Sequence, residues 1–109
     1  MVLMQFSIFP LDKGESVGAY VARVARIIDE SGLSYRLHAM GTVVEGELDQ
    51  CLALLRRCFE ELEKDCNRII CNVYFDERKG YGGRLRGKVE SVEKHLGRSL
   101  RGADRGPEV

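Results

Sequence analysis

No group of residues in this sequence has the spacing of a known catalytic motif, but several polar side chains alternate with apolar ones in a pattern that suits ligand binding. Gln5 and Ser7 follow this pattern near the start of the chain, and Asn72 and Asp76 follow it near the end. A surface of this kind is too polar for a dry core and too apolar for ordinary solvent exposure. It is typical of a face that meets a second sheet, a partner or a ligand.

Glu45 has an uncommon position, because it stands between Val44 and Gly46 in a stretch typical of a strand. It is either an exposed charge at a strand end or a ligand carboxylate beside a glycine that lets another molecule come close. Thr42 lies in the same stretch. If Val43 points into the core, Thr42 lies on the opposite face, and the sequence leaves both orientations open.

The cysteines and histidines form no recognisable metal site. There is no CxxC pair, and the two histidines are not at metal-ligand spacing; the residues are Cys51, Cys58, Cys66, Cys71, His38 and His95. We therefore expect no bound metal, and thiols that are buried and inert. A Cys58–Cys66 or Cys66–Cys71 disulfide is the alternative in an oxidising compartment or a thermophilic host.

The elements that position these residues follow from the hydrophobic periodicity. Alternation predicts four strands, at residues 2–9, 34–40, 42–45 and 68–76. Steps of three and four predict a helix that Ser16 opens as N-cap and Gly32 ends, a second from residue 47 or 48 to 64, and a short one at 88–96. This order predicts an α+β ferredoxin-like βαββαβ sandwich, a four-stranded antiparallel sheet with two helices on one face, plus a C-terminal helix.

Strand alternation also predicts which side chains lie on each face of the sheet. The face toward the helices takes Met4, Phe6, Ile8, Leu37, Ile69, Cys71, Val73 and Phe75. The open face takes Leu3, Gln5, Ser7, Phe9, Arg36, His38, Ile70, Asn72, Tyr74 and Asp76. One interpretation of this mixed open face is an interface between copies of the chain that holds no ligand.

Size and charge exclude several classes of protein. The 109 residues make one domain, which we place at residues 1–98, with a flexible tail at 99–109. Seventeen basic residues balance 17 acidic ones, which argues against bulk electrostatic binding of nucleic acid and against a polybasic membrane anchor. The apolar N-terminal run is too short to span a bilayer and lacks the features of a signal peptide, so we expect a cytoplasmic protein.

Four segments of the chain resemble the small prokaryotic thiamine-binding proteins, long carried as a conserved family of unknown function. The segments are FSIFPLDKGESVGAYV, YRLHAMGTVVEGELDQ, RIICNVYFDERKG and KVESVEKHLG. The resemblance implies a ferredoxin-like fold and sheet-to-sheet dimers that pair into tetramers. It also implies non-catalytic binding of thiamine or its hydroxymethylpyrimidine moiety, with no cofactor. The loop at residues 77–87 and the tail after residue 98 fall outside it.

Only Thr42 and Glu45 are carried over by the family's pattern, within the run from Gly41 to Gly46. The other candidates rest on strand alternation. The aminopyrimidine edge needs hydrogen-bonding groups, its face an apolar or aromatic wall, and the thiazolium cation a carboxylate or a ring. We assign the edge to Gln5, Ser7, Thr42 and Asn72, the face to Phe9 or Tyr35 and the cation to Glu45 or Asp76, with His38 as a further candidate.

Three other functions share this topology. An acylphosphatase-like enzyme needs a phosphate-binding loop; Lys13 and Gly14 could hold an anion, but no nucleophile–base pair accompanies them. An RNA-binding module needs aromatic and basic residues, which occur only loosely as Phe9, Tyr74, Arg78, Lys79, Arg84, Arg86 and Lys88. A regulatory domain for another small ligand would use similar polar groups. We expect a binding protein that is not an enzyme.

Overall fold

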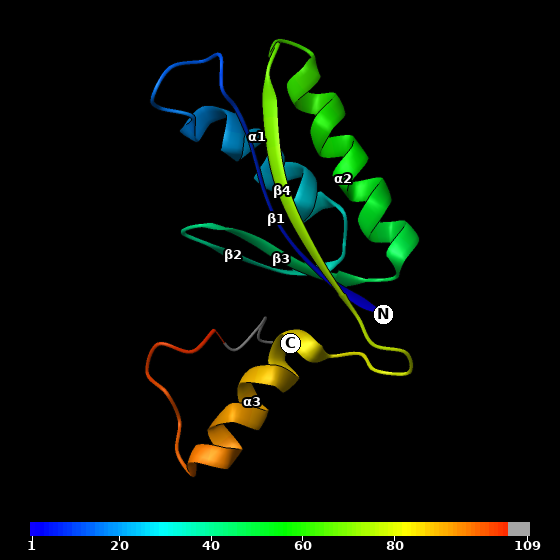
Figure 1. Ribbon diagram of the computed structural model, residues 1–109, viewed down its shortest axis with the longest axis vertical. Coiled ribbons are helices and arrows are strands. Elements are labelled where there is room, and N and C mark those ends of the chain that lie inside the picture. The colour runs from blue at the N-terminus through cyan, green and yellow to red at the C-terminus, as the bar shows by residue number, and fades with distance from the viewer. Residues whose placement is uncertain (105–109) are drawn as a thin grey trace.

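The computed structural model describes residues 1–104 as seven elements in the predicted order. The strands are β1 (Val2–Pro10), β2 (Ser34–His38), β3 (Gly41–Gly46) and β4 (Ile69–Glu77), and the helices are α1 (Gly18–Glu30), α2 (Leu48–Glu63) and α3 (Arg84–Leu96). Figure 1 shows α1 and α2 beside the sheet and α3 beyond one end of it. The predicted α+β architecture is confirmed.

The sheet has the order β2-β3-β1-β4, and every neighbouring pair is antiparallel. β1 is therefore a central strand that pairs with β3 on one side and β4 on the other. Its even-numbered residues are buried toward the helices, and its odd-numbered residues lie on the open face, as the alternation predicted. Both helices pack on the same side of the sheet.

The core lies between the sheet and the two helices. Met4 and Val44 are fully buried on the sheet, and Ile28 and Leu62 meet them from α1 and α2. Each such side chain contributes roughly 1.5–3 kcal/mol of hydrophobic stabilisation. The three- and four-residue spacing of the apolar residues in both helices is what places them on this one layer.

The β2–β3 hairpin is shorter than the central strand it packs against. The β1–β3 ladder ends where Phe6 pairs with Thr42, whereas β1 continues along β4 until Pro10 pairs with Ile69. At the end of the ladder, a Cβ on Gly41 would lie 2.7 Å from the backbone oxygen of Phe6. This close approach and a φ of +153° require glycine there.

Two predicted helix starts are wrong. Ser16 is not the N-cap of α1, because the helix begins at Gly18 after Val17 and has no side-chain cap. The C-terminal helix was predicted at residues 88–96 but begins four residues earlier, at Arg84. Its N-cap, Gly83, has no side chain to offer, so the acceptor for the first helical N–H comes from elsewhere in the fold.

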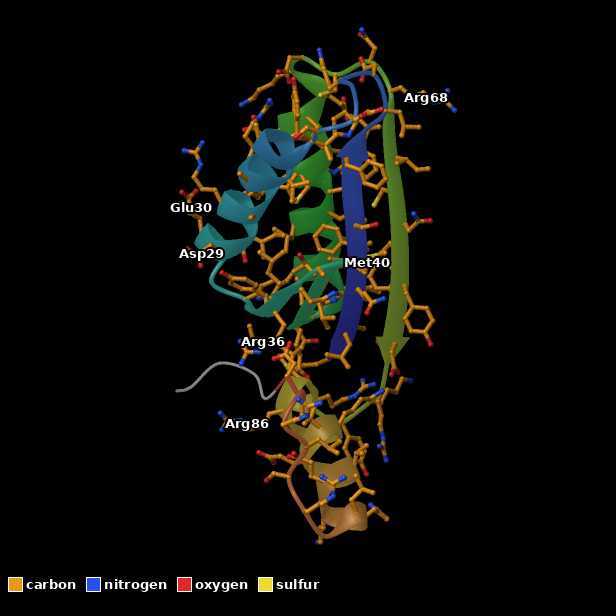
Figure 2. All side chains as sticks on the ribbon, turned by 90° about the vertical axis from the view of Figure 1, so that its left-hand side faces the viewer. Asp29, Glu30, Arg36, Met40, Arg68 and Arg86 are labelled. Atoms are coloured by element: carbon orange, nitrogen blue, oxygen red, sulfur yellow. The ribbon has the colours of Figure 1, made fainter. Side chains whose placement is uncertain are left out.

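α3 gives the molecule an elongated outline (Figures 1 and 2), with principal extents of 48 × 29 × 22 Å. The radius of gyration is 15.2 Å, against roughly 13 Å for a compact chain of this length. After α3, the Leu100 N–H donates to the Glu93 carboxylate and Asp104 pairs with Arg36. The rest of the predicted tail, residues 105–109, lies outside the described residues.

Candidate functional site

A cavity of about 430 Å³ opens where β1 runs past the end of the hairpin. The walls come from α1, from the tip of the β2–β3 hairpin and from the second half of β1. The lining residues are Phe6, Ser7, Ile8, Phe9, Val21, Val24, Ala25, Ile28, Leu37, His38, Ala39, Met40, Gly41, Thr42 and Asn72. This volume is within the usual range for a small-molecule site.

The cavity draws residues from both faces of the sheet. Thr42 pairs with Phe6 and with Leu37, so it points toward the helices with them. Ser7 pairs with Asn72 on the open face. Both sets reach one cavity because no strand covers this edge of β1 beyond the hairpin. The structure thereby decides the orientation that the sequence left open, and Thr42 is not on the open face.

The backbone of Ile8 adds two polar groups to this site. Leu11 N–H donates to Arg68 C=O, and Arg78 N–H donates to Met1 C=O, so odd-numbered residues at both ends of β1 bond toward β4. Successive residues of a strand direct their peptide groups to opposite sides. Ile8 therefore directs its N–H and C=O away from β4, past the end of the β1–β3 ladder and toward the cavity.

Thr42 is the buried polar side chain of the cavity. Within residues 1–104, no group hydrogen-bonds its hydroxyl. In this part of the chain, no side-chain oxygen that is fully shielded from solvent lacks a partner, so the Thr42 hydroxyl is open to the cavity, where water or a ligand can bond to it. His38, at the rim, accepts a hydrogen bond at Nδ1 from the Met40 N–H at 3.3 Å, so Nε2 carries the proton of the neutral ring.

Two other predicted residues lie outside the cavity lining. Gln5 is exposed in the middle of the open face. Tyr35 faces the helix layer, where its hydroxyl donates to Asp29 Oδ1 at 2.6 Å. This hydrogen bond to the carboxylate raises the pKa of the Tyr35 phenol. Tyr35 therefore ties β2 to the end of α1.

The two candidate carboxylates for the cation both hold α3. Glu45 is only 6% exposed, and its Oε2 accepts a hydrogen bond of 2.9 Å from the Arg84 N–H, the first of α3. Asp76 pairs with the Arg84 guanidinium and with Lys88 at 2.8 Å. These bonds, with Lys88 the stronger, lower the pKa of the Asp76 carboxyl. We call this group, Glu45, Asp76, Arg84 and Lys88, the α3 clasp.

The clasp and the cavity lie at different places on the sheet. Glu45 and Thr42 are three residues apart on β3, which corresponds to roughly 10 Å along a strand. Four of the eight predicted site residues line the cavity, namely Ser7, His38, Thr42 and Asn72. Two of the basic residues that follow β4, Arg84 and Lys88, belong to the clasp. A third, Arg78, stacks on the Tyr81 ring at 3.7 Å.

Sequence reasoning missed the apolar half of the cavity. Val21 and Ala25 border the α1 stripe, and Met40 sits at the hairpin tip with its side chain exposed (Figure 2). A methionine after a predicted strand and a second apolar row on a helix are weak signals by themselves. They indicate a binding site only once the short hairpin is seen to place these residues around the end of β1.

The cysteines form no disulfide within the described part of the chain. All four cysteines are free; three are buried and Cys71 is half-buried. Burial raises the pKa of the Cys58 thiol to about 12. Among residues 1–104, His, Cys, Asp and Glu side chains form no cluster that could hold a metal ion. In the same part of the chain, the helices are too short or too polar to cross a membrane.

Comparison with known proteins extends these observations. The UPF0045 protein YqgV of Bacillus subtilis is 34% identical over 102 residues, covering 88% of this chain and 98% of the relative. The protein MJ1052 of Methanocaldococcus jannaschii is 32% identical over 91 residues, covering 84% and 91% of the two chains. Its crystal structure superposes with a TM-score of 0.78 at 31% identity, covering 85% and 96%.

A Thermotoga maritima structure, TM0486, has the same fold with a TM-score of 0.74 at 21% identity, and it covers 84% of this chain and 97% of its own. A role in thiamine biosynthesis or salvage has been suggested for that protein. Residues 4–93 of this chain, which run from within β1 to within α3, match the family described as thiamine-binding protein. The chain belongs to the thiamine-binding protein family.

Proposed function

We propose that this protein binds thiamine or its hydroxymethylpyrimidine moiety in the cavity at the end of β1, without turning it over. The observation that carries the proposal is Thr42, a buried residue whose hydroxyl has no hydrogen-bond partner within residues 1–104 and is accessible from a cavity of about 430 Å³. The family membership supports the choice of ligand. The protein would hold its ligand as a carrier, buffer or sensor does.

The chemistry of the cavity fits an aminopyrimidine. The ring is flat and apolar on its faces, and α1 and the hairpin supply apolar walls through Val21, Leu37 and Met40. Its edge carries ring nitrogens that accept and an amino group that donates. The Thr42 hydroxyl and the peptide group of Ile8 each offer one donor and one acceptor to such an edge.

The cationic thiazolium needs a different environment. The cavity lining within residues 1–104 contains no carboxylate, and Phe9 is its aromatic ring near the open face. The pyrimidine therefore occupies the interior of the cavity, and the thiazolium lies at the mouth, against an aromatic ring or solvent. This arrangement uses neither Glu45 nor Asp76, which hold α3.

The mixed polar and apolar open face is the surface through which we propose that copies of the chain associate. Tyr74 and Ile70 are both exposed there, on the edge strand β4. Ser7 and Asn72 lie on the same face and also border the cavity. Association through this face would therefore bring a second copy next to the ligand, and ligand binding would stabilise the assembly by mass action.

Calorimetric titration tests the proposal directly, with thiamine and hydroxymethylpyrimidine used separately on protein whose mass is known from light scattering. We expect saturable binding of both. Thr42→Val should weaken binding by about 1–3 kcal/mol, or roughly 5- to 150-fold, because a buried ligand group loses its partner. Ser34→Ala is the matched control, since it removes an exposed hydroxyl on β2 outside the cavity.

The Glu45→Gln variant distinguishes two possible positions of the thiazolium cation, at the cavity mouth or beside the Glu45 carboxylate. With the thiazolium at the cavity mouth, this variant should bind thiamine and the neutral pyrimidine with an unchanged ratio of affinities. A loss confined to thiamine would place the cation beside the clasp and contradict the cavity site. No heat with either ligand, from protein that is fully folded, would refute the proposed function.

A further inference from the structure

The zero net charge of this chain conceals a strong separation of charge. Residues 1–77, which form the sheet with α1 and α2, contain 8 Lys and Arg against 13 Asp and Glu, a net charge of −5. Residues 78–104, which form the basic loop and α3, contain 8 against 3, a net charge of +5. The acidic body and the basic C-terminal segment therefore attract each other, within one chain or between chains.

α3 carries an apolar stripe whose second half its own chain leaves uncovered. Leu85, Val89, Val92 and Leu96 recur at helical spacing; Leu85 and Val89 are half-buried, whereas Val92 and Leu96 are both 53% exposed. The clasp holds α3 through polar groups at its first turns. Figure 1 shows the rest of the helix extending away from the sheet. Val92 and Leu96, the exposed half of the stripe, are therefore not what attaches α3 to the body.

A second uncovered apolar surface lies on the helix side of the edge strand. Val73 and Phe75 point toward the helix layer yet are 43% and 37% exposed, because α2 packs mainly over β1. α2 runs antiparallel to β4, so Leu48 and Leu52, both exposed, border the same area. We call these four residues the β4 flank. Acidic groups lie at its end, at Glu47, Asp49 and Glu77.

We propose that α3 of one copy of this chain packs its apolar stripe on the β4 flank of a second copy, and that the exchange is reciprocal. The two surfaces match in kind, because each is apolar and one is bordered by basic residues and the other by acidic ones. A reciprocal exchange forms the same contact twice around a two-fold axis. Such an exchange would account for the elongated shape of the single chain, in which α3 extends away from its own sheet.

This interface is separate from the open face of the sheet, since the β4 flank lies on the opposite side of the same strand. It also makes no use of the cavity, so its failure would leave the proposed ligand binding untouched. Burial of the exposed apolar side chains of α3 and of the β4 flank would supply the affinity. The opposite charges would set the orientation and the rate of association.

The test is the mass of the full chain by analytical ultracentrifugation between about 1 and 100 μM. The helix variant carries Val92→Asp and Leu96→Asp, and the flank variant carries Leu52→Asp and Val73→Asp. We expect each variant alone to have half the mass of the wild-type assembly or less. Leu11→Asp is the matched control, because it charges an exposed leucine outside both surfaces and should leave the mass unchanged.

Mixing the two variants gives the decisive result. The helix variant retains an intact flank, and the flank variant retains an intact α3, so an equimolar mixture should recover association through one contact of the two. Two variants that are each dissociated but do not complement one another would show that α3 pairs with α3, or flank with flank, and would overturn the proposal. A helix variant of unchanged mass, or a wild-type chain that stays monomeric throughout, would also overturn it.

Three further measurements guard against a trivial outcome. Circular dichroism of each variant checks that the fold is intact. Glu77→Lys changes only an exposed charge at the end of β4, and it should raise the dissociation constant several-fold without affecting folding. The wild-type dissociation constant should likewise rise between 0.05 and 0.5 M salt, as expected when opposite charges are screened. Salt independence together with a silent Glu77→Lys would contradict the role of charge.

Discussion

Replacement of Glu45 by alanine should release α3 while leaving the sheet intact. The Glu45 carboxylate is buried and accepts the first N–H of α3 at 2.9 Å. A hydrogen bond to a charged group contributes about 1.5–3 kcal/mol, and its loss leaves a donor without a partner. The capping contribution of 0.5–2 kcal/mol describes the same contact and is not added to it. We therefore expect the closed state of α3 to lose about 1.5–3 kcal/mol.

Hydrogen exchange measured peptide by peptide is the assay, because it reads the opening of α3 separately from unfolding of the whole domain. At about 1.4 kcal/mol per tenfold, the amides of α3 should exchange roughly 10- to 150-fold faster in Glu45→Ala. Those of β1 should be unchanged. Glu45→Gln retains an acceptor oxygen and loses only the charge at the helix N-terminus, so its effect should be smaller, by about 0.3–1 kcal/mol.

Glu60→Ala is the control, because it removes an exposed carboxylate on α2 that has no contact with α3. The reasoning would be refuted if exchange in α3 were unchanged while β1 and β3 exchanged faster. Glu45 would then stabilise the sheet rather than hold the helix. Equal effects of alanine and glutamine would show that the charge, and not the acceptor oxygen, is what α3 requires.

Three other substitutions or conditions give separate tests. Gly41→Ala should destabilise the fold by about 1–3 kcal/mol in urea unfolding, because the new Cβ meets a backbone oxygen of β1; Gly87→Ala, which meets open space on α3, should be neutral or stabilising. The Cys58 thiol, whose pKa burial raises to about 12, should react with a thiol reagent at pH 8 only as fast as the protein unfolds; rapid labelling would contradict its burial. The hydrogen bond from Arg23 lowers the pKa of Asp65, so this pair stabilises the protein above the carboxyl's ordinary pKa of 3.8 and loses that contribution as the pH falls through the lower, folded-state value. Asp65→Asn should flatten the fall of the melting temperature between pH 5 and pH 2, and an unchanged profile would show that the pair contributes nothing.

The sheet and two of its helices could be predicted because each has an unambiguous period. In β1, the even-numbered residues are all apolar and the odd-numbered ones are mixed, so the sequence alone identifies the buried face. β3 offers no such contrast. Thr42 and Val44 share one parity, Val43 and Glu45 the other, and only pairing with β1 decides between them.

The site was only half predictable, for geometric reasons. Ser7 and Asn72 could be paired from strand alternation. The cavity itself exists because β1 is longer than the hairpin strand β3 that pairs with it. Strand ends are the part of a sequence-based prediction that is least precise, so this difference in length could not be predicted. The start of α3 at Arg84 was missed because its capping group is Glu45, which is 39 residues away in sequence and so leaves no local signal.

The pairing of β1 also bears on how the chain folds. Val2 pairs with Glu77, 75 residues later, so β1 cannot be completed on its β4 side until β4 has been synthesised. At ribosomal rates of 5–20 residues per second, that interval is about 4–15 s. During it, a strand rich in β-forming apolar residues has a free edge, which is the condition under which chains associate wrongly. Yield on overexpression should therefore depend on synthesis rate and temperature more steeply than the stability of the finished fold would suggest.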